Sequence, residues 1–323
     1  MGIAFVDILY WKSLTGNFGD DMNQWFWRRV VADAAFENHE IAILGIGSLL
    51  GGVIEGELAK IPEKKKVVLG SGFDYIRTPN SILNRDSRWD IRFVRGPITA
   101  QHIGCEPEKA ICDPAIVVSE IMKPNELLEG EQHSIFVPHW QTAQNGHWKR
   151  AVDLTSIEYV DPRADFLHVL ARIASSKLVL AESLHAAIIA DSFRVPWVPI
   201  KTGGHIAGTK WNDWAQSLGV QFEQTEILDL VELPTTESIG TSSWLRHGKS
   251  LLRSIVPDGA RQRARSLIGA GARALSEGGQ FERAAKSIEA VAEGDGFMSE
   301  EGACSLAKER VFEQFDAFNR RYA

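Results

Sequence analysis

The chain has 323 residues, 44% of them apolar and 24% charged, which excludes a disordered or fibrous protein and leaves ample material for a buried core. Its 35 Lys and Arg against 42 Asp and Glu give a net charge of −7, which argues against a general nucleic-acid binder, because such proteins carry a basic surplus. No apolar run approaches the roughly 20 residues that span a bilayer, and the N-terminus lacks the features of a signal peptide.

The three cysteines, Cys105, Cys112 and Cys304, are odd in number and lack metal-ligand spacing. They therefore predict neither a disulfide framework nor a zinc site. We expect a soluble, cytoplasmic and reduced protein with no nucleic-acid partner and no protein-bound metal.

Short apolar runs alternate with amphipathic stretches along the first two hundred residues, and this alternation predicts an α/β fold with a mainly parallel sheet covered on both faces. The expected strands are Ile3–Tyr10, Ile41–Leu44, Val67–Leu69, Ile91–Val94, Ala110–Cys112, Ser134–Val137, Ile157–Val160, Leu178–Leu180 and Trp197–Ile200. The expected helices between them are Asp21–Phe36, Gly51–Ile61, Pro97–Ile103, Arg163–Ser175 and Leu184–Phe193.

The polar segment 122–132 contains Pro and Gly and interrupts this alternation, so we place a domain boundary there. We predict two doubly wound, Rossmann-like domains, residues 1–124 and 125–235, with a cleft between them. No convincing strand follows Glu232, and residues 236–323 are expected to form a helical extension. Its expected helices lie around Thr241–Ile255, Ala260–Ser276, Phe281–Ala292 and Ser299–Phe318.

Within this extension, residues 246–273 hold seven basic residues and one acid, with apolar residues interleaved. Such a basic amphipathic stretch favours one of two arrangements. It lies on an anionic membrane surface, or it is a solvated helix face packed on the body of the protein.

Ligands of open parallel sheets bind beyond the carboxyl ends of the strands, and several polar loops of this chain fall there. They are Asn17–Asp21, Gly45–Ser48, Gly70–Phe73, Arg95–Pro97, Asp113–Ala115, Pro138–Trp140 and Glu182–His185. If the fold prediction holds, these loops converge on one cleft.

The loop Gly45–Ser48 lacks the third glycine of the dinucleotide fingerprint, because a leucine takes that position, and the chain has no Walker lysine–hydroxyl pair. Two interpretations stay open for Gly47 and Ser48, and likewise for Ser71 and Gly72 in the next loop. The backbone N–H groups bind an anion such as phosphate, or the glycines form tight turns with positive φ.

Three of the charged residues in these loops of the first half are candidates for the site. Arg95 is aimed at the expected cleft floor, where its planar guanidinium can bind a carboxylate or phosphate; the alternative is a salt bridge between elements. Asp20 and Asp113 each stand at a turn before a helix, where aspartate commonly caps. For Asp113 we favour a structural cap.

In the second half, His185 starts the apolar helix and follows Glu182 closely. A helix N-terminus lowers a histidine pKa and a carboxylate raises it, so we expect exchange of protons near neutral pH. The alternative is a hydrogen-bonded structural histidine. His139 and Trp140 suit contact with the apolar face of a sugar. No serine nucleophile elbow is present.

The order of the loop motifs resembles the polysaccharide pyruvyl transferase family. The motifs are NFGD at 17–20, ILGIGS at 43–48, LGSGF at 69–73, VRGPIT at 94–99, DPA at 113–115, VPH at 137–139 and SLHA at 183–186. Within the family they look most like the bacterial ketal pyruvyltransferases of exopolysaccharide (succinoglycan-type) synthesis. The resemblance implies two Rossmann-like domains facing across a cleft, as in GT-B glycosyltransferases, often with a C-terminal helix crossing back.

The resemblance also implies an activity: transfer of a pyruvyl group from phosphoenolpyruvate to two hydroxyls of a sugar, which forms a cyclic ketal and releases phosphate. It implies that His185 protonates carbon 3 of the donor and that Asp20 is the base for a sugar hydroxyl. The implied donor-binding residues are Arg95, Gly47, Ser48, Ser71, Gly72 and Ser183, and the implied acceptor-binding residues are His139 and Trp140. No cofactor is expected, the need for a divalent cation is open, and the acceptor would be a lipid-linked oligosaccharide at the membrane.

One position departs from the family pattern. Many members have a basic residue directly before the Leu-His pair, whereas this chain has Ser183, which brings no charge to the donor. Lys201 and Arg77 are candidates to compensate. Two other functions stay open: a GT-B glycosyltransferase with a nucleotide-sugar donor, for which Glu182 is the candidate ribose ligand, and a non-catalytic, membrane-associated assembly protein.

Overall fold

The computed structural model describes residues 7–52, 55–73, 86–123, 126–127, 132–144, 146–203, 208–227, 230 and 279–323. Their strands form two sheets in which all paired strands run parallel. The first, in the order β1-β2-β3-β4, contains β1 Asp7–Leu9, β2 Ile41–Leu44, β3 Lys65–Leu69 and β4 Trp89–Phe93. The second, in the order β6-β5-β7-β8-β9, contains β5 Ser134–Val137, β6 Glu158–Tyr159, β7 Leu178–Ala181, β8 Trp197–Lys201 and β9 Thr225–Glu226.

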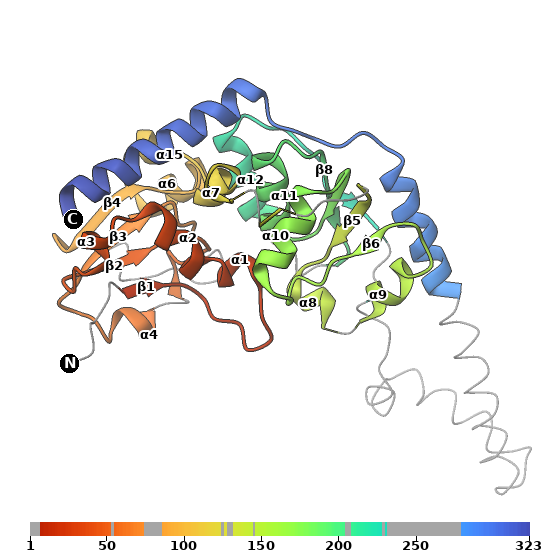
Figure 1. The fold of residues 1–323 in the computed structure, drawn as a ribbon, viewed down its shortest axis with the longest axis horizontal. Coiled ribbons are helices and arrows are strands. Elements are labelled where there is room, and N and C mark those ends of the chain that lie inside the picture. Colours follow the sequence, from red (N-terminus) through yellow and green to blue (C-terminus); the bar gives the residue numbers. More distant parts are fainter. Residues whose placement is uncertain are drawn as a thin grey trace, which may run out of the picture.

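Helices connect the strands in both halves of the molecule (Figure 1). In the first half they are α1 Phe18–Asp21, α2 Asn23–Val30, α3 Asp33–Phe36, α4 Glu55–Leu58, α6 Pro97–Ile103, the 3-10 turns η2 Pro107–Lys109 and η3 Pro114–Val117, and α7 Val118–Ile121. In the second half they are α8 Trp140–Ala143, α9 His147–Val152, α10 Phe166–Ala174, α11 Leu184–Ser192 and α12 Gly208–Ser217. Residues 279–292 are helical, and α15 Glu301–Tyr322 ends the chain.

The central strands explain why the sheets need helices on both faces. All four residues of β2 and all four of β7 are buried. Strands buried on both faces read as continuous apolar runs, as parallel sheets require. The expected parallel α/β architecture is therefore confirmed.

Some expected elements differ from the structure. Ala110–Cys112 is not a strand; Ala110 makes an isolated bridge to Val94, because the chain turns at once into η3. The stretch Asp21–Phe36 begins at the last residue of α1 and forms two short helices, α2 and α3, in place of one, since Val31 and Ala32 adopt extended backbone. Short β9 was missed. The expected helices Thr241–Ile255 and Ala260–Ser276 lie outside the described residues.

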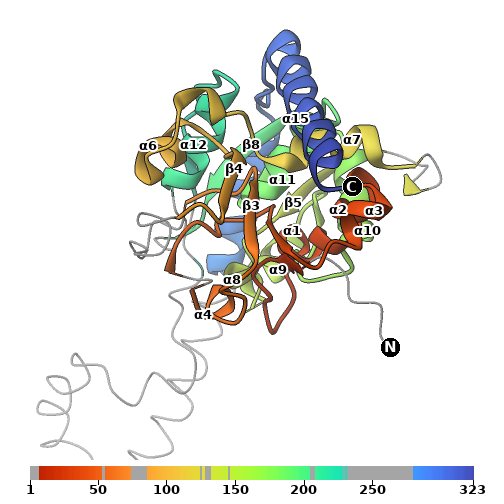
Figure 2. The same cartoon turned by 90° about the vertical axis from the view of Figure 1, so that its left-hand side faces the viewer.

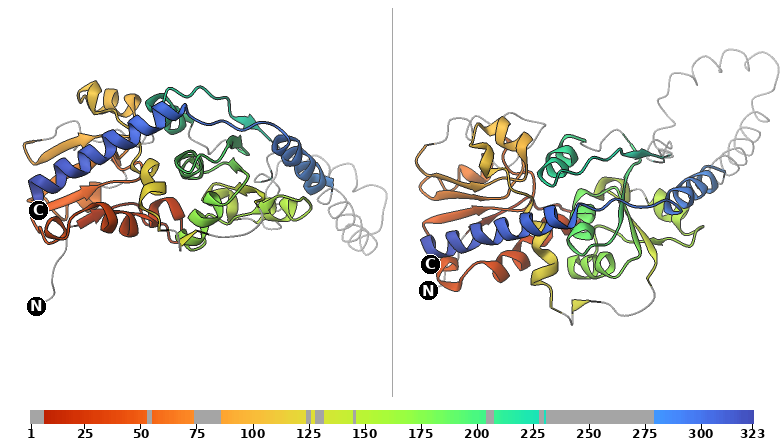
Figure 3. Two further views of the ribbon diagram at one scale, coloured as in Figure 1. Left: turned by 45° about the horizontal axis from the view of Figure 1, so that its top comes forward. Right: turned by 90° about the horizontal axis from the view of Figure 1, so that it is seen from above.

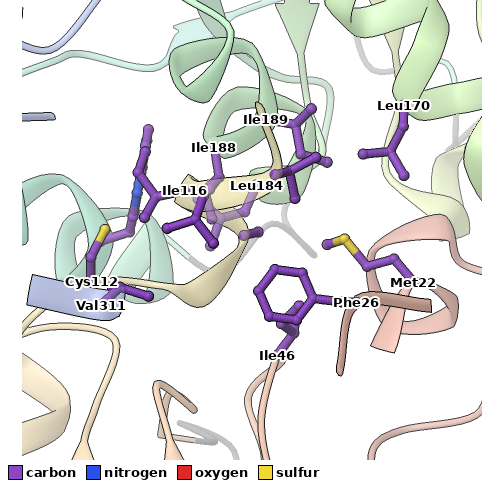
Figure 4. Packing of buried hydrophobic residues seen from close by; sticks show 14 of the residues in the cluster. Met22, Phe26, Ile46, Cys112, Ile116, Leu170, Leu184, Ile188, Ile189 and Val311 are labelled. Carbon is purple, nitrogen blue, oxygen red and sulfur yellow. The ribbon is translucent and has the colours of Figure 1, made fainter. Parts of the chain in front are cut away.

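A single hydrophobic cluster joins the two halves. Figure 4 shows Met22 and Phe26 of the first half in the same packing cluster as Leu170 and Leu184 of the second. Backbone contact adds to this packing, because the Phe18 N–H donates to the Pro162 carbonyl at 2.8 Å. The GT-B-like arrangement and the domain limits 1–124, 125–235 and 236–323 stay predictions.

The C-terminal helix α15 crosses back over the first half (Figures 2 and 3). Asn319 accepts a hydrogen bond from the Ala32 N–H and donates one to the Val30 carbonyl, and the Tyr322 hydroxyl donates to Asp90 at 2.7 Å. Among the described residues, no helix is both long enough and apolar enough to cross a membrane.

Candidate active site

Asp20 lies in a tight turn at the start of the first helical segment. Asn17 caps the turn with its carbonyl, which accepts from the Asp20 N–H, and its side-chain amide donates to Asp20 Oδ2 at 2.5 Å. A Cβ built on Gly47, whose φ is +124°, would lie 3.3 Å from Asp20 Oδ1. The carboxyl group is thus enclosed, and burial raises the pKa of Asp20 to about 7, while the Asn17 hydrogen bond and the charge of Lys210 lower it in part.

His185 reaches the same place from the second half. It lies in the first turn of α11, and a Cβ at Gly19 would overlap its Nδ1, so the imidazole packs directly on the Gly19 backbone next to Asp20. Burial, together with the charges of Lys210 and Arg95, lowers the pKa of His185 to about 3. The expected titration near neutral pH is therefore wrong for the unliganded site, because burial, which lowers the pKa as the helix dipole does, outweighs the nearby carboxylate.

Asp113 has two roles. One carboxylate oxygen accepts from the Ala115 N–H at 3.0 Å and caps η3, which confirms the favoured structural cap. The other, Oδ2, faces His185 Nε2 at 3.9 Å. Neither Oδ2 nor Nε2 has a hydrogen-bond partner among the described residues, although both are buried. Burial raises the pKa of Asp113 to about 6. We call Asp20, Asp113 and His185 the junction site.

Arg95 lies beside the junction site but is held by the protein itself. It is 1% exposed, its Nε donates to Asp213 Oδ2 at 3.2 Å, and its Nη1 donates to Ser48 Oγ at 3.0 Å. A Cβ at Gly72 would overlap the guanidinium, so a side chain at this position would displace Arg95 from its place. The structure thus contains the salt bridge that we gave as the alternative, and it joins the end of β4 to α12. Donor binding by Arg95 stays a prediction.

The two glycine loops of the first sheet bind each other. The Gly72 N–H donates to the Gly47 carbonyl at 2.9 Å, and the buried Ser71 hydroxyl donates to the same carbonyl at 3.1 Å and accepts from the Leu49 N–H. The Gly72 N–H and the Ser71 hydroxyl are therefore already hydrogen-bonded within the protein, as the tight-turn interpretation expects. We therefore no longer place Ser71 and Gly72 among the donor ligands.

Glu182 forms hydrogen bonds that link the loops after β5 and β8 of the second sheet. Its buried carboxylate accepts from the His139 N–H at 2.7 Å and from the Thr202 N–H at 3.1 Å, and the Thr202 hydroxyl donates to it as well. His139 caps α8, and its ring lies 5.8 Å from the half-buried ring of Trp140. Glu182 was the candidate ribose ligand for a nucleotide-sugar donor, but its carboxylate is bound to backbone N–H groups of the protein.

Lys210 is the residue that sequence reasoning missed. It lies in the first turn of α12, half-buried, and its charge acts on Asp20 and on His185. Burial lowers its pKa to about 8. The sequence signal that could have pointed to it is the glycine-rich segment TGGHIAG at 202–208, which follows β8 and leads into α12. Of the expected substitutes for the missing basic residue, Lys201 pairs with Glu226 at 2.7 Å, and Arg77 lies outside the described residues.

In the part of the chain that the structure describes, no group of three or more His, Cys, Asp or Glu side chains could hold a metal ion. The junction site and the neighbouring Lys210 offer acids, a neutral imidazole and an amine as their chemistry. Such a set can move protons and bind an anion.

Comparison with known proteins gives two matches. Residues 15–204 match the family model described as polysaccharide pyruvyl transferase. Over 219 residues the chain is 40% identical to the succinoglycan biosynthesis protein ExoV of Rhizobium meliloti (strain 1021). That alignment covers 68% of this chain and 66% of the relative, slightly under two thirds of its length. No solved structure gives a significant match. The junction site falls within the family match, whereas Lys210 lies beyond its end.

Proposed function

This chain belongs to the polysaccharide pyruvyl transferase family, and we propose that it transfers the pyruvyl group of phosphoenolpyruvate to two hydroxyls of one sugar in an exopolysaccharide repeat unit. The products would be a cyclic ketal and phosphate. The observation that carries the proposal is the junction site, where Asp20 and Asp113 of one half meet His185 of the other.

The first step needs an acid. Protonation of carbon 3 makes carbon 2 electrophilic, and His185 is our candidate donor of that proton. In the unliganded site its pKa is about 3, so the imidazole is neutral. A bound donor carries several negative charges, which favour the imidazolium, and Asp113 Oδ2 at 3.9 Å from Nε2 would stabilise it further.

The second step needs a base. A sugar hydroxyl forms a bond to carbon 2 and gives its proton to Asp20, whose pKa of about 7 suits a general base. The bond from carbon 2 to the phosphate oxygen then breaks. The second hydroxyl of the same sugar closes the ring, and its proton leaves with the phosphate. Asp20 then releases its proton and His185 takes one up, which restores both residues and balances the reaction.

Donor and acceptor would be bound by different elements. Ser183 is the N-cap residue before α11 and makes no side-chain capping bond, and the N–H groups at that helix start favour an anion. Arg95, which is held in place by Asp213 and Ser48, would add positive charge to the donor site. His139 and Trp140, at the end of β5, are the proposed contacts for the acceptor sugar.

We expect no cofactor, and we expect the acceptor to be a lipid-linked oligosaccharide. The basic stretch 246–273, which lies outside the described residues, would hold the protein at an anionic membrane surface. Sedimentation with vesicles rich in anionic lipid tests this part alone.

The activity is tested with the purified chain, phosphoenolpyruvate and oligosaccharide repeat units of bacterial exopolysaccharides. We expect release of phosphate together with an acceptor that has gained one pyruvyl ketal by mass spectrometry. If no repeat unit supports release while a related pyruvyltransferase acts in the same assay, the proposal is wrong. Transfer of a sugar from a nucleotide sugar would identify a glycosyltransferase instead.

A further inference from the structure

The amine of Lys210 is a positive charge beside the junction site, and among the described residues no carboxylate forms a salt bridge with it. Lys210 and Asp213 are one turn apart on α12, so their side chains share a face of that helix. Asp213 fixes this face, because its carboxylate accepts from Arg95 Nε, from the Thr99 N–H at 2.9 Å and from the Thr99 hydroxyl at 2.5 Å.

The turn before α6 brings α12 close to the site. A Cβ at Gly96 would overlap the Asp213 backbone, so only glycine lets the two elements meet, and α6 lies beside α12 in two views (Figures 1 and 2). The first turn of α12 therefore lies near the loop that carries Arg95. The groups that interact electrostatically with the Lys210 amine are Arg95, Asp20, Glu182 and His185.

None of these groups pairs with Lys210. Among the described residues the amine has no salt bridge and no hydrogen bond, in contrast to Lys201, whose amine is 2.7 Å from Glu226. The carboxylate of Glu182 is bound to His139 and Thr202. A half-buried ammonium without a partner is costly. Two buried polar atoms of the junction site, His185 Nε2 and Asp113 Oδ2, also have no hydrogen-bond partner among the described residues.

We propose that Lys210 binds the phosphate group of the donor and so supplies the charge that Ser183 does not bring. This inference rests on the proposed function, since it assigns one group of that donor to one residue. A lysine suits phosphate, which it meets as a point charge, whereas a carboxylate is best bound by the flat fork of an arginine. Release of phosphate breaks the contact at the end of each turnover.

The test compares Lys210→Gln and Lys210→Arg with Lys201→Gln as the matched control. The control removes a lysine charge from the same half of the protein, at the end of β8, where the amine is already paired. Binding of inorganic phosphate and of pyruvate is measured by titration calorimetry, and KM and kcat are measured with phosphoenolpyruvate. Thermal unfolding of each variant shows that the fold is intact.

We expect Lys210→Gln to weaken phosphate binding and to raise KM by about 10- to 100-fold, the usual effect of one hydrogen bond to a charged group. Pyruvate binding and kcat should change much less, Lys210→Arg should retain most of the affinity, and Lys201→Gln should behave as the wild type. Wild-type phosphate affinity in Lys210→Gln overturns the inference, as does loss of pyruvate binding in place of phosphate binding.

The two proposals fail in different ways. If the wild type transfers pyruvyl groups and Lys210→Gln has an unchanged KM, only the role of Lys210 is wrong. If phosphate binding depends on Lys210 but no acceptor gains a ketal, the anion site stands and the proposed function is wrong.

Discussion

Two neighbouring regions of this protein use the same kinds of polar group in opposite ways. In the glycine-loop region, which consists of Gly47, Ser48, Ser71, Gly72 and Arg95, hydrogen bonds join the groups to one another or to Asp213. In the junction site, His185 Nε2 and Asp113 Oδ2 face each other at 3.9 Å with no partner among the described residues. Buried polar groups are normally satisfied, so the first region supports the fold, and we propose that the second binds a ligand.

The largest expected effect is on the junction site. His185→Gln removes the proposed acid, and we expect kcat to fall by about 100- to 10,000-fold. Thermal stability should change little, because Nε2 has no hydrogen bond among the described residues to lose. Steady-state kinetics and thermal unfolding measure the two effects, with the exposed His168→Gln as control. An unchanged kcat would remove His185 from the mechanism.

In the glycine-loop region, by contrast, we expect substitutions to lower the stability of the fold. Asp213→Ala leaves Arg95 buried without its carboxylate, and breaking a buried pair costs about 3–5 kcal/mol of unfolding free energy. The control is Asp153→Ala, which breaks an exposed pair with Lys149 and should cost less than about 1 kcal/mol. Urea unfolding measures both. Equal stabilities would show that the Arg95–Asp213 pair does not support the fold.

Asp20→Asn is expected to change the stability of the fold in a way that depends on pH. The folded pKa of about 7 lies above the ordinary 3.8, so the folded state binds the proton more tightly; the resulting stability is complete at low pH and is lost as pH rises through 7. The asparagine variant should therefore be more stable than the wild type at pH 8, by up to about 4 kcal/mol, and similar at pH 4.

The same residue sets the pH dependence of catalysis. If Asp20 is the base, wild-type kcat/KM rises with pH through about 7, as the carboxyl loses its proton, and Asp20→Asn is inactive. The exposed Asp295→Asn should change neither stability nor activity. A wild-type rate that falls as pH rises through 7 would make Asp20 the acid and reverse the two roles.

The smallest effect is expected at Ser71. Ser71→Ala removes the hydroxyl that joins the glycine loops and leaves the Leu49 N–H without its acceptor, a loss of about 1–3 kcal/mol of unfolding free energy. The KM for phosphoenolpyruvate should not change. A raised KM with unchanged stability would return Ser71 to the donor site.

The sequence predicts the local elements well because their signals are local. Pro97–Ile103 is reproduced residue for residue, since Pro stands at its first position and Gly104 ends it with a φ of +62°. Asp20 and His185 were singled out by local signals as well, as each lies at or near the start of a helix, and their catalytic roles stay predictions. The failure at Ala110–Cys112 is also local: Asp113 and Pro114 start a 3-10 turn before a strand can form.

What the sequence could not predict depends on partners far along the chain. Arg95 meets Asp213, 118 positions away, and only that contact distinguishes a salt bridge from an open ligand site. The pKa values of Asp20 and His185 are set by burial between two halves, which periodicity does not reveal. Lys210 was missed because its neighbours at the junction site come from other elements.

The central claim is that the donor binds at the junction site and not on the glycine loops. A crystal structure of the protein with phosphoenolpyruvate tests it most directly. We predict a donor next to His185 Nε2, with its phosphate at the Lys210 amine and the Ser71 hydroxyl still bound to Gly47. A donor seated on the backbone of Ser71 and Gly72, away from His185, would contradict the account.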